Sequence, residues 1–129
     1  MGIKDYLTDI GVEIVKEKIN GEIEERQVRK RISSFVESEY VKNISVTKAE
    51  ELDAQGLFKY LQSSFIEEVK VRLTESNAKR RGEMHDLIMH KAADYAKANT
   101  RLSEQRAKRI TSDAMNILRE YYKKKVNFR

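Results

Sequence analysis

The chain contains two histidines, His85 and His90, the residue type most often used for metal binding and for acid–base catalysis near neutral pH. Their spacing of five places them roughly 140° apart around a helix, so they cannot readily hold one metal ion together. Asp86 precedes His90 by four residues, a spacing typical of a surface salt bridge on a helix. The sequence has no cysteine, which excludes thiolate nucleophiles and thiolate metal sites. We therefore expect the domain to use neither a metal nor a cofactor.

Arg80 and His85 are separated by four residues. This pair resembles the Arg-x4-6-His motif of the helical ribonuclease domains called HEPN, in which the arginine and histidine of two protomers meet across a dimer to cut RNA. The residue after the motif arginine is usually small and polar or histidine, whereas Arg81 stands here. The chain has neither a Gly-x-Ser-x-Gly elbow nor a glycine-rich phosphate loop. We therefore expect a non-catalytic domain and keep the ribonuclease as an alternative.

Positive charge is concentrated in the C-terminal quarter of the sequence. Residues 97–129 hold 10 bases against 3 acids, whereas the whole chain carries a net charge of only +5. Clustered lysine and arginine side chains can bind phosphates and release counterions, so this segment is a candidate nucleic-acid-binding surface. The candidate basic surface consists of Arg101, Arg109, Lys123, Lys124 and Lys125.

Two features of the same segment also fit a purely structural role. Asp113 stands four residues after Arg109, and Glu120 stands four before Lys124, so both acids can pair on a helix surface. The lysines near the end can simply complement the helix C-terminus. Tyr121, Tyr122 and Phe128 are interleaved with those lysines and could stack on bases, although Tyr121 fits better in a packing seam.

The secondary-structure elements that position the histidines and the basic residues are predicted to be helices. The chain has no proline and five glycines, too few turn residues for an all-β fold. Apolar residues recur at helical spacing over residues 3–20, 23–41, 84–98 and 103–126. Residues 43–48 are predicted to be a loop, and residues 74–82 a flexible connector or a frayed helix start.

Helix starts in the middle of the chain are indicated by capping residues. Thr47 with Glu50 can form a capping box, and Asp53 could instead cap a shorter helix. Ser64 with Glu67 repeats the capping signature before a further helix. Thr100 or Ser103 can cap the last helix.

The last helix has the most regular apolar pattern in the chain. Ala107, Ile110, Ala114, Ile117 and Tyr121 are spaced alternately by three and four residues, as in a narrow packing seam. The alanines allow a partner helix to approach closely. Since the break near residue 100 is short, we expect that partner to be the helix at 84–98, packed in the antiparallel direction.

Four segments resemble the helical N-terminal region of bacterial STAND-class NTPases of NACHT type. They are Asp53-Ala-Gln-Gly-Leu-Phe-Lys-Tyr-Leu, Phe65-Ile-Glu-Glu-Val, Ala93-Asp-Tyr-Ala-Lys-Ala-Asn-Thr100 and Ile117-Leu-Arg-Glu-Tyr-Tyr-Lys-Lys-Lys125, and the resemblance covers a little over half of the chain. It implies an adaptor domain of an NLR-like antiviral defence protein, with the nucleotide site in a downstream domain. No functional residue is carried over, because the shared patterns are helix-packing patterns.

Taken together, these patterns predict an all-α protein, a compact bundle of five or six helices forming a single domain over residues 1–129. Its predicted function is a protein–protein interaction or adaptor module, through a protein partner or self-association. Nucleic-acid binding is the alternative, and no small-molecule substrate is evident. The N-terminus has acids where a signal peptide would have a cationic region, and no stretch approaches about 18 apolar residues. We therefore expect a cytoplasmic protein that does not act at a membrane.

Overall fold

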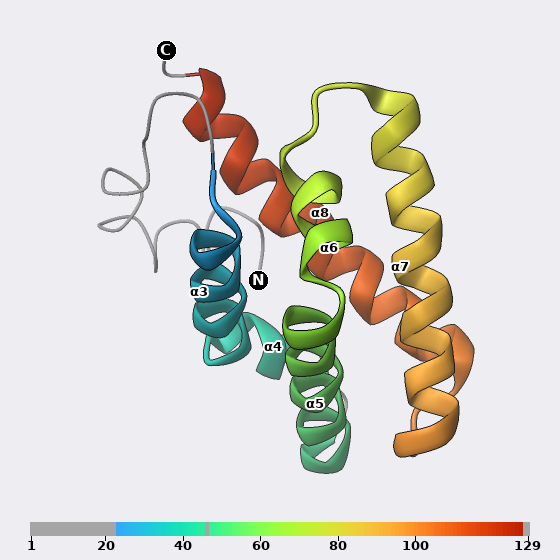
Figure 1. Cartoon of the computed structure of the whole chain (residues 1–129). Helices are drawn as coiled ribbons and strands as arrows, with labels where there is room; N and C mark the ends of the chain where they lie inside the picture. Colours follow the sequence, from blue (N-terminus) through green and yellow to red (C-terminus); the bar gives the residue numbers. More distant parts are fainter. Residues whose placement is uncertain (1–22, 46, 128–129) are drawn as a thin grey trace.

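The computed structural model describes residues 23–45 and 47–127. Within these ranges the chain forms six helices and no strand, which confirms the prediction of an all-α bundle (Figure 1). The helix predicted for residues 3–20 lies outside the described residues. The helices are α3 (Glu25–Val36), α4 (Glu39–Ile44), α5 (Lys48–Ser64), α6 (Ile66–Thr74), α7 (Ala78–Asn99) and α8 (Glu104–Asn127).

One hydrophobic core joins all six helices. Figure 1 shows α5 and α6 following one another between α3 and α7, while α8 crosses the bundle diagonally. Helix α8 packs against α7, α6 and α5, and α3 packs against α5 and α6. Apolar stripes at helical spacing supply the core, as expected for helices with one buried face. Its large buried members include Val28, Ile32, Phe35, Leu57, Phe58, Leu61, Leu73, Ile88, Ile110, Leu118 and Tyr121.

The helix predicted for residues 23–41 is divided in two. Helix α3 ends at Val36, and Ser38 takes the N-cap position of α4 in an extended conformation. The Ser38 hydroxyl donates to the carbonyl oxygen of Phe35 at 2.6 Å. Serine side chains compete in this way with backbone helix bonds, which explains the break. The predicted loop at 43–48 is correspondingly shorter, because α4 continues to Ile44.

Capping predictions for the central helices are confirmed at one site and wrong at another. The Thr47 hydroxyl oxygen accepts a hydrogen bond from the Glu50 amide at 3.1 Å, so Thr47 caps α5. Asp53 does not cap a shorter helix, since it lies within α5. The prediction for Ser64 is wrong: Ser64 is the last residue of α5, and Phe65 occupies the boundary with α6.

Helix α7 begins earlier than the sequence indicates. The Asn77 side chain accepts from the Arg80 amide at 3.0 Å and caps a helix that starts at Ala78. Most of residues 74–82 is therefore helical, including Gly82, which agrees with the predicted helix start rather than with the connector. Within α7, Ile88 is fully buried, whereas Leu87 is 45% exposed and does not belong to the core.

The predicted seam of α8 is confirmed. All five seam residues are buried, with exposed fractions of 2% or less. Ser103 caps the helix, because its hydroxyl oxygen accepts from the Arg106 amide at 3.0 Å. Helix α7 packs against α8 and has small buried residues of its own. These buried small residues of α7 are Ala92, Ala93 and Ala96.

Candidate functional site

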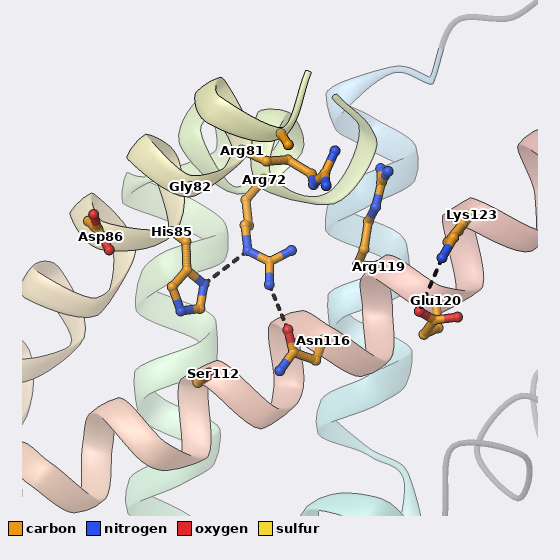
Figure 2. A pocket seen from close by; sticks show the side chains of 11 residues that line it. Arg72, Arg81, Gly82, His85, Asp86, Ser112, Asn116, Arg119, Glu120 and Lys123 are labelled. Atoms are coloured by element: carbon orange, nitrogen blue, oxygen red, sulfur yellow. Dashed lines mark hydrogen bonds and ion pairs between the residues drawn. The ribbon is translucent and has the colours of Figure 1, made fainter. Parts of the chain in front are cut away.

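A basic groove lies between α7 and α8. It consists of two adjoining pockets of about 660 Å³ and about 600 Å³, which share His85 and Ser112. We call the first the arginine pocket, because α6, α7 and α8 each contribute an arginine to it (Figure 2). The cationic side chains that line the whole groove are Arg72, Arg81, Arg106, Lys108, Arg109, Arg119 and Lys123.

Helix α8 forms one wall of the groove because of its two-sided pattern. Arg109, Ser112, Asn116, Arg119 and Lys123 follow one another at spacings of three and four, which places them on one helix face. The buried seam occupies a different face of the same helix. Burial of the seam therefore fixes the direction in which the polar face points.

Arg72 lies at the centre of the arginine pocket. It comes from the last turns of α6 and is only 8% exposed. Its Nε donates to Nδ1 of His85 at 2.9 Å, and its Nη2 donates to Oδ1 of Asn116 at 2.7 Å. Burial and, to a lesser extent, the positive charges of Arg81 and Arg119 lower the pKa of Arg72. Three guanidinium groups are thus close enough to repel one another.

Arg81 and Arg119 hold the C-terminal end of α6. Nη1 of Arg81 donates to the carbonyl oxygens of Glu75 and Ser76 at 3.0 and 2.9 Å. Nη1 of Arg119 donates to the carbonyl oxygen of Leu73 at 2.9 Å. Cationic side chains commonly bind the unpaired carbonyls at a helix end in this way. The pKa of Arg119 is lowered by burial and by the nearby charge of Arg81, while Glu120 and Glu75 oppose that shift.

His85 is neutral in this arrangement, because Nδ1 can accept from Arg72 only when it carries no proton. The remaining proton is then on Nε2. Partial burial, followed by the positive charge of Arg72, lowers the pKa of His85, and Asp86 opposes this shift. The structure therefore keeps an uncharged imidazole beside a buried guanidinium.

Few carboxylates neutralise the groove. Among the described residues, only the carboxylates of Asp86 and Glu120 line it, and Glu120 approaches Lys123 at 4.0 Å. Within residues 23–45 and 47–127, no carboxylate lies within ion-pair distance of Arg72, Arg81 or Arg119.

Arg106 differs from the other groove cations because it has a carboxylate partner. Its Nε and Nη2 both donate to Oε1 of Glu50, at 3.2 and 2.7 Å, and the bonded carboxylate raises the pKa of Arg106. Arg106 Nη2 also donates to the carbonyl oxygen of Ile44. It therefore joins α8 to the α4–α5 region.

The structure brings together only part of the predicted basic surface. Arg109 and Lys123 both line the groove, on the same face of α8. Arg101 lies in the α7–α8 connection outside the groove, with its amide donating to Asp53 Oδ2 at 3.3 Å. Helix α8 continues through Lys124 and Lys125, but their side chains lie outside the described part of the protein.

Arg80 and His85 do not share a site. Arg80 Nε lies 3.5 Å from Glu75 Oε1, and Arg80 lines a separate pocket with Glu67 and Glu68. The guanidinium bonded to His85 belongs to Arg72 instead. The HEPN motif needs these residues from two protomers, so their separation within one chain does not test the ribonuclease alternative, which stays a prediction.

The carboxylate partner of His90 was predicted wrongly. His90 Nε2 lies 3.5 Å from Asp94 Oδ2, four residues later, rather than near Asp86. In the part of the chain that the structure describes, no group of three or more histidine, aspartate or glutamate side chains could hold a metal ion.

Two further expectations about α8 also need correction. Tyr122 is fully buried and packs edge-on against Tyr121, with ring centroids 5.1 Å apart, so it cannot stack on bases. Asp113 forms no ion pair with Arg109 among the described contacts, and its charge instead acts on Tyr40 and Arg106. Phe128 lies outside the described residues.

Sequence reasoning missed Arg72, Arg81 and Arg119 as a group. Arg119 could have been found, because it lies on the same helical face as Arg109 and Lys123. Arg72 carries no such signal, since its partners His85 and Asn116 are 13 and 44 residues away in the sequence.

Comparison with known protein families, curated proteins and solved structures finds no match to this chain. The resemblance to NACHT-type NTPases therefore stays a prediction. Among the residues searched, no helix is both long and apolar enough to cross a membrane. The fold and the site define a helical domain with an arginine-rich groove. The function proposed below is argued from this groove.

Proposed function

We propose that the domain is a non-catalytic module that binds the phosphate backbone of a nucleic acid strand in the α7–α8 groove. The observation that carries this proposal is the composition of the groove: among the described residues it has seven cationic and two carboxylate side chains, and of the seven cations Arg106 is also paired with Glu50. Lysine and arginine side chains gain binding free energy from phosphates through direct attraction and counterion release.

The length of the groove fits a strand better than a single small anion. Arg109 and Lys123 are 14 positions apart on α8, which corresponds to about 21 Å along a helix. One strand of a B-form duplex carries about six phosphates over that length. Arg109 and Lys123 can therefore contact separate phosphates of one strand.

A binding role also agrees with the chemistry of the groove. His85 uses Nδ1 to accept from Arg72, so that nitrogen is not available as a general base. Backbone contacts of this kind position a nucleic acid without reading its sequence. We expect weak sequence preference and strong dependence on salt concentration.

The adaptor function predicted from the sequence remains a second proposal, together with the link to NACHT-type defence proteins. Leu52 and Leu87 are the two large apolar side chains exposed in the described ranges, at 59% and 45%. They lie on α5 and α7 and offer positions at which a protein partner could be tested. Sedimentation of the parent protein and of a Leu87→Ser variant would test self-association through α7.

The nucleic-acid proposal is tested by fluorescence anisotropy with single-stranded RNA and DNA over a range of salt concentrations. The test variant combines Lys108→Gln, Arg109→Gln and Lys123→Gln, three exposed groove residues. We expect it to weaken binding by at least about tenfold. The slope of log affinity against log salt should fall by about 2, since each lost phosphate contact contributes about 0.7 on a single strand.

A matched control removes the same charge elsewhere. Lys48→Gln, Lys59→Gln and Lys97→Gln change three exposed lysines that do not line the groove. This variant should retain most of the affinity and the salt slope of the parent. Equal losses in the two triple variants would show that net charge alone drives binding, and absence of binding at low salt would overturn the proposal.

A further inference from the structure

We propose that the arginine pocket is a subsite for a phosphate monoester, such as the terminal phosphate of a nucleic acid strand. This inference rests on the proposed function and deepens it, because it assigns a chemical class of ligand to one end of the groove. The pocket lies between the C-terminal turns of α6, the first turns of α7 and the polar face of α8. Figure 2 shows Arg72 beside the His85 ring, with the guanidinium groups of Arg81 and Arg119 on the side of Arg72 that faces away from His85.

Unused hydrogen-bond donors point to an anionic ligand. Each guanidinium group carries five N–H donors in a planar fork, and the fork matches the oxygens of a phosphate. Nη2 of Arg81, Nη2 of Arg119 and Nη1 of Arg72 have no hydrogen-bond partner among the described residues. Each of the three arginines therefore retains a terminal nitrogen for a ligand.

The same arginines are already held in place without a ligand. Arg81 and Arg119 are fixed by the carbonyl oxygens at the end of α6, and Arg72 is fixed by His85 and Asn116. A preorganised site loses less conformational entropy when it binds its ligand. These structural bonds therefore support anion binding rather than compete with it.

The charge of the pocket matches a monoester better than a diester. The described lining residues include the cations Arg72, Arg81, Arg119 and Lys123 and the carboxylates Asp86 and Glu120, a net charge of +2 while His85 is neutral. A phosphate monoester carries a charge of about −1.5 to −2 at pH 7, because its second pKa is about 6. A backbone diester carries only −1 and would leave repulsion between the guanidinium groups partly uncompensated.

Gly82 leaves room for such a ligand. It lies within α7 and lines the arginine pocket, and a Cβ atom built at this position would meet no other atom within 4 Å. Glycine within a helix lowers stability by about 1 kcal/mol relative to alanine. The open space at Gly82 therefore comes with a loss of stability. The first atom of a larger side chain would therefore fit at this position on the wall of the pocket.

The test compares oligonucleotides of roughly 12 nucleotides, within the footprint range of small single-strand-binding domains. One carries a 5′-monophosphate, one carries a 3′-monophosphate, and one has hydroxyl groups at both ends; each is labelled away from the phosphate. We expect the parent protein to bind at least one monophosphorylated strand about tenfold more tightly than the hydroxyl strand. The 5′ and 3′ arms identify which end of the strand enters the pocket.

Gly82→Gln is the blocking variant, because it places a flexible uncharged side chain in the open space and keeps every cation. Ala98→Gln adds the same side chain at an exposed position of α7 outside the groove and is its matched control. Loss of the monophosphate preference in Gly82→Gln, with the preference retained in Ala98→Gln, supports the subsite. Far-ultraviolet circular dichroism checks that both variants remain helical.

Failure of the subsite can be separated from failure of the proposed function. Equal binding of phosphorylated and hydroxyl strands would overturn the subsite while leaving the backbone function intact. If no oligonucleotide binds, the proposed function fails, and titration with inorganic phosphate followed by the NMR signals of the His85 ring decides the subsite. A saturable shift of the His85 signals that Gly82→Gln removes would support it, and unchanged signals would overturn it.

Discussion

Arg72 Nε donates a hydrogen bond to His85 Nδ1 at 2.9 Å, so a buried guanidinium relies on an imidazole that carries no positive charge. Protonation of Nδ1 would remove the acceptor and place a second cation beside the first. The bond between these two residues therefore links the protonation of His85 to the packing of α6 against α7.

The first prediction concerns the pH dependence of stability. The pKa of His85 is lowered in the folded protein, by burial first and then by Arg72. Between the unfolded pKa near 6.5 and the lower folded pKa, the unfolded state binds more protons than the native state. The free energy of unfolding should therefore fall as the pH is lowered from about 7 through that window, in denaturant titrations at several pH values.

His85→Gln should reduce this pH dependence, because an amide oxygen can accept from Arg72 without titrating. His90→Gln removes the exposed histidine of the same helix and should retain the slope of the parent. An unchanged slope in His85→Gln would mean that other groups cause the loss of stability in acid.

The second prediction concerns the packing seam of α8. Ile117 is 2% exposed, so Ile117→Ala should lower the free energy of unfolding by about 2–5 kcal/mol. Lys123→Gln on the exposed face of the same helix should change stability by no more than a few tenths of a kcal/mol. Urea unfolding measures both, and an Ile117→Ala protein as stable as the parent would refute the docked position of α8.

The third prediction compares two glycines within helices. Gly82→Ala should stabilise the fold by about 0.5–1 kcal/mol, because alanine loses less conformational entropy than glycine in a helix. The added Cβ atom would meet no other atom within 4 Å. At Gly56 a Cβ atom would lie 3.2 Å from the Tyr95 hydroxyl oxygen, and the Tyr95 ring is stacked on Tyr60. Gly56→Ala should therefore be less stable than Gly82→Ala by about 1 kcal/mol in thermal unfolding. Equal gains at both sites would show that Tyr95 moves aside freely.

The fourth prediction concerns the ion pair between Arg106 and Glu50, whose side chains are 32% and 16% exposed. A double-mutant cycle with Arg106→Gln and Glu50→Gln should give a coupling free energy of about 1–2 kcal/mol. The same cycle for the exposed pair Lys42 and Glu39 should give only a few tenths. Coupling free energies of equal size in the two cycles would mean that partial burial does not strengthen the ion pair between Arg106 and Glu50.

Local sequence patterns predicted a structural feature correctly where that feature depends on a single helix. The seam of α8 follows from its apolar spacing, and Thr47 caps α5 because its side chain needs only a neighbouring amide. The break at Ser38 was missed, since the apolar period continues across it to Tyr40. Leu87 continues the apolar period of residues 84–98, yet it is 45% exposed.

The groove was only partly predictable for a related reason. Arg109 and Lys123 were recognised because they share one helix with a regular pattern. The arginine pocket requires α6, α7 and α8 to be placed relative to one another, and no spacing in the sequence carries that information. Adjacent helix positions point about 100° apart, so Arg81 lines the arginine pocket and Arg80 does not.

Helix α8 contacts α7 more extensively than any other helix, and α7 also packs extensively against α6. Contacts between neighbours in the sequence close short loops, which require little search of chain conformations. We therefore expect α6, α7 and α8 to assemble early during refolding, on a time scale of microseconds to milliseconds. The hydrogen bond from Arg106 to the Ile44 carbonyl oxygen joins residues 62 positions apart. We therefore expect it to form late, when α3 and α4 pack against the other helices.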